Sequence, residues 1–320
     1  YAFVVLDLNE PDTLIAARNA SPLAIGKGEI LNSVGSDAIA LAGIAKQIIF
    51  LEDGDFAILN KEEVNIFDLE GNKIQREVKP NSLDPAIISK GNHRHYMQKE
   101  IYEQPETISH TISEMYNGNG QISEKLSQII KENPNSITIL AAGTSYYAGL
   151  IGKYWIEYFS NIPVYADIGS EYRYRDNILS NDTLGIAISQ SGETMDTLEC
   201  LKKLKKNNIY SGSIVNVISS SIARESNFIL PTLAGPEIGV ASTKAFTSQL
   251  IVLALFSRYA QQEKNIKIKK SSEIFNSLFN IQKLIKKVLL KDKKINEISK
   301  ILKNSKSIFY IGRGTMYPLA

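Results

Sequence analysis

The sequence predicts an α/β protein in which a β-rich segment precedes a parallel sheet with helices on both faces. Three observations support this prediction. From about residue 126, short apolar segments alternate with helical patterns, as is typical of parallel sheets. Before residue 60, short apolar runs alternate with turn-forming clusters, as is typical of strands. Apolar residues make up 43% of the 320 residues and charged residues 22%, so the chain can form a sizeable core.

The β-rich segment contains four apolar runs that we expect to form strands, at 3–6, 15–17, 23–25 and 48–51. Residues 64–72 predict a further hairpin. A short helix is predicted from Ser36 to Ala45, because Ser36 or Asp37 can cap its first turn.

Residues from about 75 to 125 are more polar and contain three prolines. We interpret them as a linker with helical content. The run from His95 has a helical pattern. We expect this helix to end at Pro105, because proline lacks the backbone N–H that a continuing helix needs.

The rest of the chain supplies the elements of the parallel sheet. We expect strands at 137–141, 164–168, 184–188, 213–218 and 228–230, and helices at 146–159, 193–206 and 244–259. Residues 264–306 combine many lysines with Ile, Leu and Phe at helical spacing. A pair of amphipathic helices with a solvated lysine face is the favoured interpretation, and a patch for an anionic partner is the alternative.

The composition excludes several classes of protein. Lys plus Arg total 36 and Asp plus Glu total 34, a net charge of +2, which gives no support for a nucleic-acid binder. Cys200 is the single cysteine, so a disulfide framework or a multi-cysteine metal site is excluded, and a reducing, cytoplasmic compartment is expected. No apolar run approaches the roughly 18 residues of a membrane span. The three histidines lack metal-ligand spacing, and we expect neither a metal nor an organic cofactor.

Two hydroxyl-rich turns follow predicted strands. The first is Ala142-Gly-Thr-Ser145, in which Thr144 and Ser145 open a helix. The second is Ser189-Gln-Ser-Gly-Glu-Thr194, which contains neither Lys nor Arg. Ligands of α/β proteins bind at the carboxyl ends of strands, and helix N-termini favour anions. The pair predicts a phosphate held by neutral donors, with Gln190 able to reach sugar hydroxyls, although each turn alone is also consistent with helix capping.

A third candidate segment is Glu237-Ile-Gly-Val-Ala-Ser-Thr-Lys244. Ser242 and Thr243 are plausible caps of the following helix, and Val240 and Ser242 can face the same pocket. Lys244 is either a catalytic amine or, as we favour for a lysine one turn into a helix, a structural residue. Glu193 is expected to complement a helix dipole rather than to act as an acid or base.

Three other residues have weaker signals. Cys200 lies on the apolar side of a predicted helix, where core packing is expected. Arg173 and Arg175 are candidates for a subunit contact or a pocket wall, and the sequence does not choose between these roles.

Two segments that are distant in the sequence are similar to each other and form an internal repeat. Ile139 to Tyr146 is similar to Tyr310 to Tyr317, with Gly143, Thr144 and Tyr146 matching Gly314, Thr315 and Tyr317. The repeat predicts that a second copy of the α/β module begins near residue 310. Because Tyr1 opens on a strand and Ala320 follows the first turn of a helix, we expect the chain to be part of a longer one.

The three candidate segments, in this order, resemble the isomerase half of the glutamine–fructose-6-phosphate aminotransferases, which is built from two sugar isomerase (SIS) domains. The run Arg94-His-Tyr-Met-Gln-Lys-Glu-Ile-Tyr-Glu-Gln-Pro105 is also similar to that family, as is Asp12 to Arg18 with Ser21-Pro22-Leu23. The resemblance implies that residues 1–62 are the C-terminal part of a β-rich, Ntn-type glutaminase domain of the type-2 glutamine amidotransferases. It further implies a linker at 63–125, a first SIS domain at 126–268, and a helical connection into a second SIS domain at 269–320.

The resemblance also implies an activity. Members of the family convert fructose 6-phosphate and glutamine to glucosamine 6-phosphate and glutamate, as homo-oligomers and without a cofactor. We therefore expect a homodimer that starts amino-sugar synthesis. The resemblance implies that the sugar phosphate is bound by Thr144, Ser145, Ser189, Gln190, Ser191 and Thr194, with Val240 and Ser242 lining the same pocket.

The family's catalytic groups have no counterpart here. The nucleophilic cysteine would precede Tyr1, and the isomerase lysine, glutamate and histidine would follow Ala320. We therefore expect the 320 residues to bind the sugar phosphate but to be inactive alone. The alternative is a non-enzymatic SIS module that senses a phosphosugar. A nucleotide-binding enzyme is disfavoured, because no Gly-x-Gly-x-x-Gly follows a strand.

Overall fold

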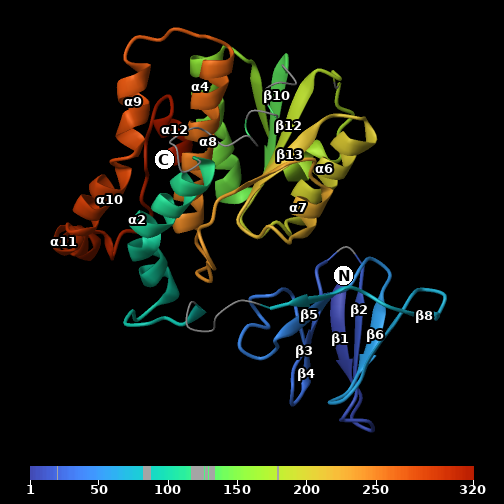
Figure 1. Ribbon diagram of the computed structural model, residues 1–320. Coiled ribbons are helices and arrows are strands. Elements are labelled where there is room, and N and C mark those ends of the chain that lie inside the picture. The colour runs from blue at the N-terminus through green and yellow to red at the C-terminus, as the bar shows by residue number, and fades with distance from the viewer. Residues whose placement is uncertain (20, 82–87, 117–125, 127–128, 130–133, 179) are drawn as a thin grey trace. The chain divides into compact units, whose positions relative to one another are not determined.

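The computed structural model describes residues 1–320 except 20, 82–87, 117–125, 127–128, 130–133 and 179. The chain divides into two compact units, Tyr1–Asn92 and His93–Ala320 (Figure 1). No helix in the described ranges is both long and apolar enough to cross a membrane.

The first unit is built from two antiparallel sheets, as the β-rich pattern predicted. One sheet has the order β1 (Ala2–Leu6), β2 (Leu14–Arg18), β6 (Phe56–Leu59), β7 (Val64–Phe67) and β8 (Lys73–Ile74). The other has the order β4 (Asn32–Gly35), β3 (Ala24–Lys27), β5 (Gln47–Phe50) and β9 (Val78–Pro80). Ala16 and Ile66 of the first sheet share one buried core with Ile25 and Ile49 of the second. The predicted hairpin at 64–72 is present as β7 and β8, and β9 carries the second sheet into the region interpreted as a linker.

The short helix predicted from Ser36 to Ala45 is wrong. These residues form successive turns, in which backbone N–H groups donate to the carbonyl three residues earlier, as from Ala42 N to Ile39 O and from Ile44 N to Leu41 O. Gly43 takes a positive φ of 77°, which a regular right-handed helix does not accommodate.

The second unit contains a parallel five-stranded sheet with the order β11, β10, β12, β13, β14. Their bounds are β10 Ser136–Ala141, β11 Val164–Ile168, β12 Thr183–Ser189, β13 Ser211–Val215 and β14 Ile229–Pro231. All four pairings are parallel, as predicted.

Helices cover both faces of this sheet (Figure 1). Ile139 of β10 and Ile188 of β12 pack in one core with residues of α4 (Gly143–Ser160) and α8 (Lys244–Glu263). The neighbouring Ala187 faces the other way and packs with Leu198 of α6 (Met195–Lys206) and Ile222 of α7 (Ser221–Glu225). Because successive side chains of a strand point to opposite faces, both layers are fixed by a continuous apolar run.

Helix α2 (Tyr96–Met115) packs against α8 and continues through Pro105, so the predicted end at that proline is wrong. Pro105 cannot donate a backbone hydrogen bond to Ile101 O. The side-chain amide of Gln104 donates to that carbonyl instead, at 3.0 Å. A local side-chain donor therefore satisfies the carbonyl that the proline leaves without a backbone partner.

Helix α5 (Gly169–Tyr172) lies between β11 and β12. Four further helices follow α8, namely α9 (Ser271–Leu278), α10 (Ile281–Leu289), α11 (Asp292–Leu302) and α12 (Met316–Leu319). Ile281 and Ile285 of α10 rest on the main core, whereas its lysines face solvent. The amphipathic interpretation of the lysine-rich region is therefore confirmed for α10. In α11 no residue is buried and Ile295, Ile298 and Ile301 are exposed, so the expected packing of the apolar stripe is not observed there, and the region forms three helices rather than a pair.

Candidate functional site

The two hydroxyl-rich turns lie side by side at the carboxyl edge of the parallel sheet. They follow β10 and β12, which are neighbours with Ala141 paired to Ile188. From β10 the chain passes through α4 to β11 on one side, and from β12 it passes through α6 to β13 on the other. Such a reversal of strand order opens a crevice between two adjacent loops, which is where open α/β sheets bind ligands.

The first turn opens α4 with a glycine in a left-handed conformation. Gly143 has a φ of +57°, and nothing lies within 4 Å of where a Cβ would stand, so its backbone conformation rather than space favours glycine. Thr144 is exposed at the helix start, whereas Ser145 is buried. The Oγ of Ser145 accepts a hydrogen bond of 3.0 Å from Nε2 of Gln249 on α8. Neither hydroxyl caps α4, whose N-cap residue is Ala142, so capping does not explain this turn.

The second turn is organised by its own hydroxyls. Ser189 is buried, and its Oγ lies 2.9 Å from Oγ1 of Thr194 and accepts a hydrogen bond of 3.0 Å from Gly192 N. The Oγ of Ser191 accepts from Glu193 N at 3.2 Å. Ser189 is therefore the internal anchor of the turn, while Gln190, Ser191 and Thr194 are partly exposed around it.

Gly192 is required by both conformation and space. Its φ is +68°, and a Cβ would stand 1.9 Å from Oγ of Ser220. Glu193 accepts a hydrogen bond of 2.9 Å from Ser221 N, the first amide of α7. Glu193 was expected to complement the helix that follows it, but the amide that it contacts belongs to α7 rather than to α6. The backbone bond from Ile222 N to Gly192 O, 2.9 Å, ties the same helix to the turn.

The third segment, residues 237–244, precedes α8. The carboxylate of Glu237 accepts hydrogen bonds from Thr243 N at 2.9 Å and from Ala245 N at 3.2 Å, and also from Oγ of Ser242 at 3.1 Å. The predicted capping by the Ser242 and Thr243 hydroxyls is therefore wrong, because Glu237 supplies the cap and takes the hydroxyls as donors. The side chain of Val240 is fully exposed, and the expectation that backbone groups near it line a pocket stays a prediction.

Asn216 joins the second turn to the chain that leads into the third segment. Its backbone N–H donates to Gln190 O at 3.2 Å, and its side-chain amide donates to Gly235 O at 2.7 Å. Its Oδ1 accepts from Ala234 N at 2.8 Å. Sequence reasoning missed Asn216, although a polar residue directly after the apolar strand β13 was a usable signal.

Comparison with known proteins identifies this α/β unit. Residues 129–257 match the SIS domain family. Over all of its length the chain is 42% identical to glutamine–fructose-6-phosphate aminotransferase of Bartonella quintana and 44% identical to that of Rhizobium meliloti, covering 53% of each. The chain is therefore similar to these aminotransferases along its whole length. It spans about half the length of the curated relatives that it matches.

A solved structure supports the same assignment. The C-terminal domain of glucosamine-fructose-6-phosphate aminotransferase from Francisella tularensis aligns with a TM-score of 0.69 and 43% identity, over 72% of this chain and 66% of that one. The resemblance inferred from the motifs and the expected parallel-sheet SIS fold are therefore confirmed.

Other candidate residues of the SIS domain have structural roles. Burial raises the pKa of Cys200 to about 12, and its thiol donates to Gly169 O at 3.2 Å. The expected core packing of this cysteine is confirmed. Lys244 is 3% exposed and pairs with Glu103 of α2 at 2.7 Å, so it is the structural lysine that we favoured.

The two arginines pair with carboxylates near the sheet edge. Arg173 contacts Asp196 in the first turn of α6 at 2.8 Å, and Arg175 pairs with Asp167 of β11. Arg173 also lines a cavity of about 330 Å³ together with Tyr174 and Lys203. This cavity contains none of the residues of the three candidate segments, so the choice between a pocket wall and a subunit contact stays a prediction.

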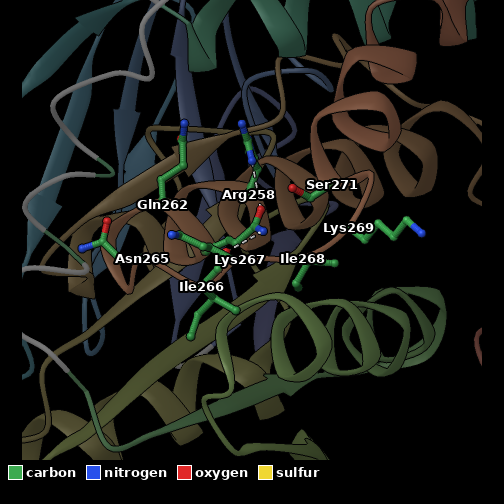
Figure 2. Close-up of a pocket in the computed structure, with 9 residues that line it drawn as sticks. Arg258, Gln262, Asn265, Ile266, Lys267, Ile268, Lys269 and Ser271 are labelled. Carbon is green, nitrogen blue, oxygen red and sulfur yellow. Dashed lines mark hydrogen bonds between the residues drawn. The ribbon is translucent and has the colours of Figure 1, made fainter.

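A larger cavity of about 680 Å³ lies where α8 ends (Figure 2). It is lined by Arg258, Gln261, Gln262, Asn265, Ile266, Lys267, Ile268, Lys269 and Ser271. The Arg258 guanidinium donates to Oε1 of Gln261 at 2.9 Å, and Nε2 of Gln261 donates to Ile266 O at 3.0 Å. These polar groups hold the turn after α8, at the opposite end of that helix from residues 237–244. In the described ranges no cluster of His, Cys, Asp or Glu is suited to a metal ion.

Proposed function

We propose that the SIS domain binds the phosphate of fructose 6-phosphate between its two hydroxyl-rich turns. The observation that carries this proposal is the adjacency of these turns at the reversal of strand order, in a chain similar over its length to the aminotransferases. The residues proposed for binding are Thr144, Ser145, Ser189, Gln190, Ser191 and Thr194.

The chemistry of the turns suits a phosphate dianion without a cationic partner. Residues 142–145 and 189–194 contain no Lys or Arg. Hydroxyls and backbone N–H groups at the start of α4 and α6 supply the donors, and the positive ends of both helix dipoles favour the charge. Because Nε2 of Gln249 donates to Oγ of Ser145, the Ser145 hydroxyl keeps its own proton to donate.

For the sugar we propose contacts from the backbone of Val240 and from Ser242. In this proposal the complete protein transfers glutamine-derived ammonia to fructose 6-phosphate and isomerises the product to glucosamine 6-phosphate, releasing glutamate. This is the first step of amino-sugar synthesis. We propose that it works in the cytoplasm as a homodimer, without a metal or organic cofactor.

We assign the parts of the chain by the same proposal. Residues 1–62 are the C-terminal part of an Ntn-type glutaminase domain, 63–125 a linker, 126–268 the first SIS domain and 269–320 the connection into a second one. The assignment of residues 269–320 to the connection into a second SIS domain is supported by the repeat. Gly314 has a φ of +59°, close to the +57° of Gly143, and is also followed by a threonine and a helix start.

The proposal is tested by titrating fructose 6-phosphate into the 320-residue chain and following the heat of binding. We expect saturable binding in the wild-type chain and a loss of at least about tenfold in affinity in Ser191→Ala/Thr194→Val, because two donors to a charged group are removed. Ser299→Ala on the exposed face of α11 is the control. Absence of binding to the wild-type chain would overturn the proposal.

The regulatory alternative is separated by turnover. We expect the complete protein to form glucosamine 6-phosphate from fructose 6-phosphate and glutamine, and the 320-residue chain alone to form none. Binding by a complete protein that yields no product would favour a phosphosugar sensor instead.

A further inference from the structure

A buried carboxylate of α2 holds the third segment by its backbone. Glu100 is 2% exposed. Its Oε1 accepts hydrogen bonds from Ile238 N at 2.6 Å and from Gly239 N at 2.9 Å, and Oε2 lies 3.2 Å from Gly239 N. Charge-assisted hydrogen bonds of this kind are about twice as strong as neutral ones. The two partners are 138 and 139 residues away along the chain, so these bonds are tertiary and not part of a local turn.

One turn further along α2, a second contact fixes the other end of the segment. Glu103 pairs with Lys244 at 2.7 Å, and Lys99 lies 3.4 Å from the same carboxylate. Lys244 is the first residue of α8. Helix α2 therefore contacts the segment at residues 238–239 through Glu100 and at its end through Glu103. Glu237 closes the segment internally through its bonds to Thr243 and Ala245.

The fit between Glu100 and the segment leaves no space for a side chain at Gly239. A Cβ there would stand 2.4 Å from Oε2 of Glu100. Residues 240–242 lie between the residues held by Glu100 and by Glu103, and within them the Ser242 hydroxyl donates to Glu237. Val240 is fully exposed among them.

We propose that Glu100 is a positioning residue for recognition of the sugar, distinct from recognition of the phosphate. This inference rests on the proposed function. The Glu100 carboxylate sets the position of Val240 and Ser242, whereas the turns at 142–145 and 189–194 are organised by other bonds. Loss of the carboxylate therefore lowers affinity for the sugar while leaving affinity for the phosphate unchanged.

The test compares two probes, fructose 6-phosphate and inorganic phosphate, titrated into variants of the full 320-residue chain. We expect Glu100→Ala to weaken binding of fructose 6-phosphate roughly five- to tenfold, because two backbone donors lose their acceptor, and to leave inorganic phosphate within about twofold. Glu100→Gln is expected to recover most of the loss, since its amide oxygen can accept the two bonds that now reach Oε1.

Glu106→Ala is the matched control, since Glu106 lies on the same helix with its side chain 74% exposed; it should change neither affinity. If Glu100→Ala does not fold, Glu100→Asp withdraws the carboxylate by one methylene, and the same selective loss is expected. Equal weakening of both probes, or no weakening of either, would overturn the inference. Failure of the wild-type chain to bind fructose 6-phosphate would instead overturn the proposed function on which it rests.

Discussion

The turns proposed for phosphate and the segment proposed for sugar are held in place by different forces. The turn at 189–194 is organised mainly by hydroxyls and backbone groups within it and on α7, together with one carboxylate, Glu193, which accepts a hydrogen bond from Ser221 N. The segment at 237–244 is held by three carboxylates, Glu100, Glu103 and Glu237, acting on backbone amides and on Lys244. A carboxylate beside an anion site repels the ligand, and the one within the turn at 189–194, Glu193, is bonded to the first amide of α7. A segment that meets uncharged sugar groups can use charged supports.

Among the variants that test this difference, we expect Gly192→Ala to have the largest effect on stability and on phosphate binding. The new Cβ would stand 1.9 Å from Oγ of Ser220, at a φ of +68°. We expect thermal and urea unfolding to show a loss of about 2 kcal/mol or more, and phosphate binding to weaken strongly.

Gly71→Ala is the control for conformation alone. Its φ is +84° with nothing within 4 Å, so it should cost only about 1 kcal/mol. Equal losses in the free energy of unfolding for the two variants would show that the Ser220 side chain moves aside and that the second turn is not tightly packed.

An intermediate effect is expected from Lys244→Met, which leaves Glu103 without its buried partner. We expect a loss of about 2 kcal/mol in the free energy of unfolding, smaller than for fully buried pairs because Glu103 is 28% exposed and keeps Lys99 nearby. Inorganic phosphate should bind as before, since the turns are organised separately.

Lys202→Met tests a surface pair in the same way. Lys202 and Glu199 lie 3.0 Å apart and are 39% and 33% exposed, so the change should stay within about 0.5 kcal/mol. A fall in phosphate affinity in Lys244→Met would break the proposed separation of the two supports.

The smallest effect is expected from Gln249→Leu, which removes the contact between α8 and the first turn. Oε1 of Gln249 is buried without a partner, so an apolar replacement should change stability by less than about 1 kcal/mol. Inorganic phosphate is expected to bind about two- to fivefold more weakly, because Ser145 loses the donor that orients its hydroxyl. An unchanged dissociation constant would show that Ser145 takes no part in phosphate binding.

The positions of the strands along the chain and of the two turns could be predicted from the sequence because both depend on local signals. Continuous apolar runs ending in Gly-Thr-Ser or Ser-Gln-Ser-Gly indicate buried strands and the loops that follow them. The structure places Ser189 and Ser191 where that reasoning expected, although their binding role stays a prediction.

The supports of the site could not be predicted, because they depend on pairs distant in sequence. The Glu100 carboxylate and Gly239 are brought together only by the packing of α2 on α8. The end of α2 was misplaced because proline was read without its neighbour Gln104, which supplies the missing donor. The turns at 36–45 were misassigned because a capping residue was weighed above Gly43.

The two glycines of the internal repeat, Gly143 and Gly314, share a backbone conformation although the residues around them differ. Their φ values of +57° and +59° are nearly the same, and each is followed by threonine and a helix start. Most flanking residues of the two segments differ, for example Ser145 against Met316. The two turns therefore share a backbone torsion and a following helix start, but residues 307–313 form no strand, whereas β10 precedes Gly143.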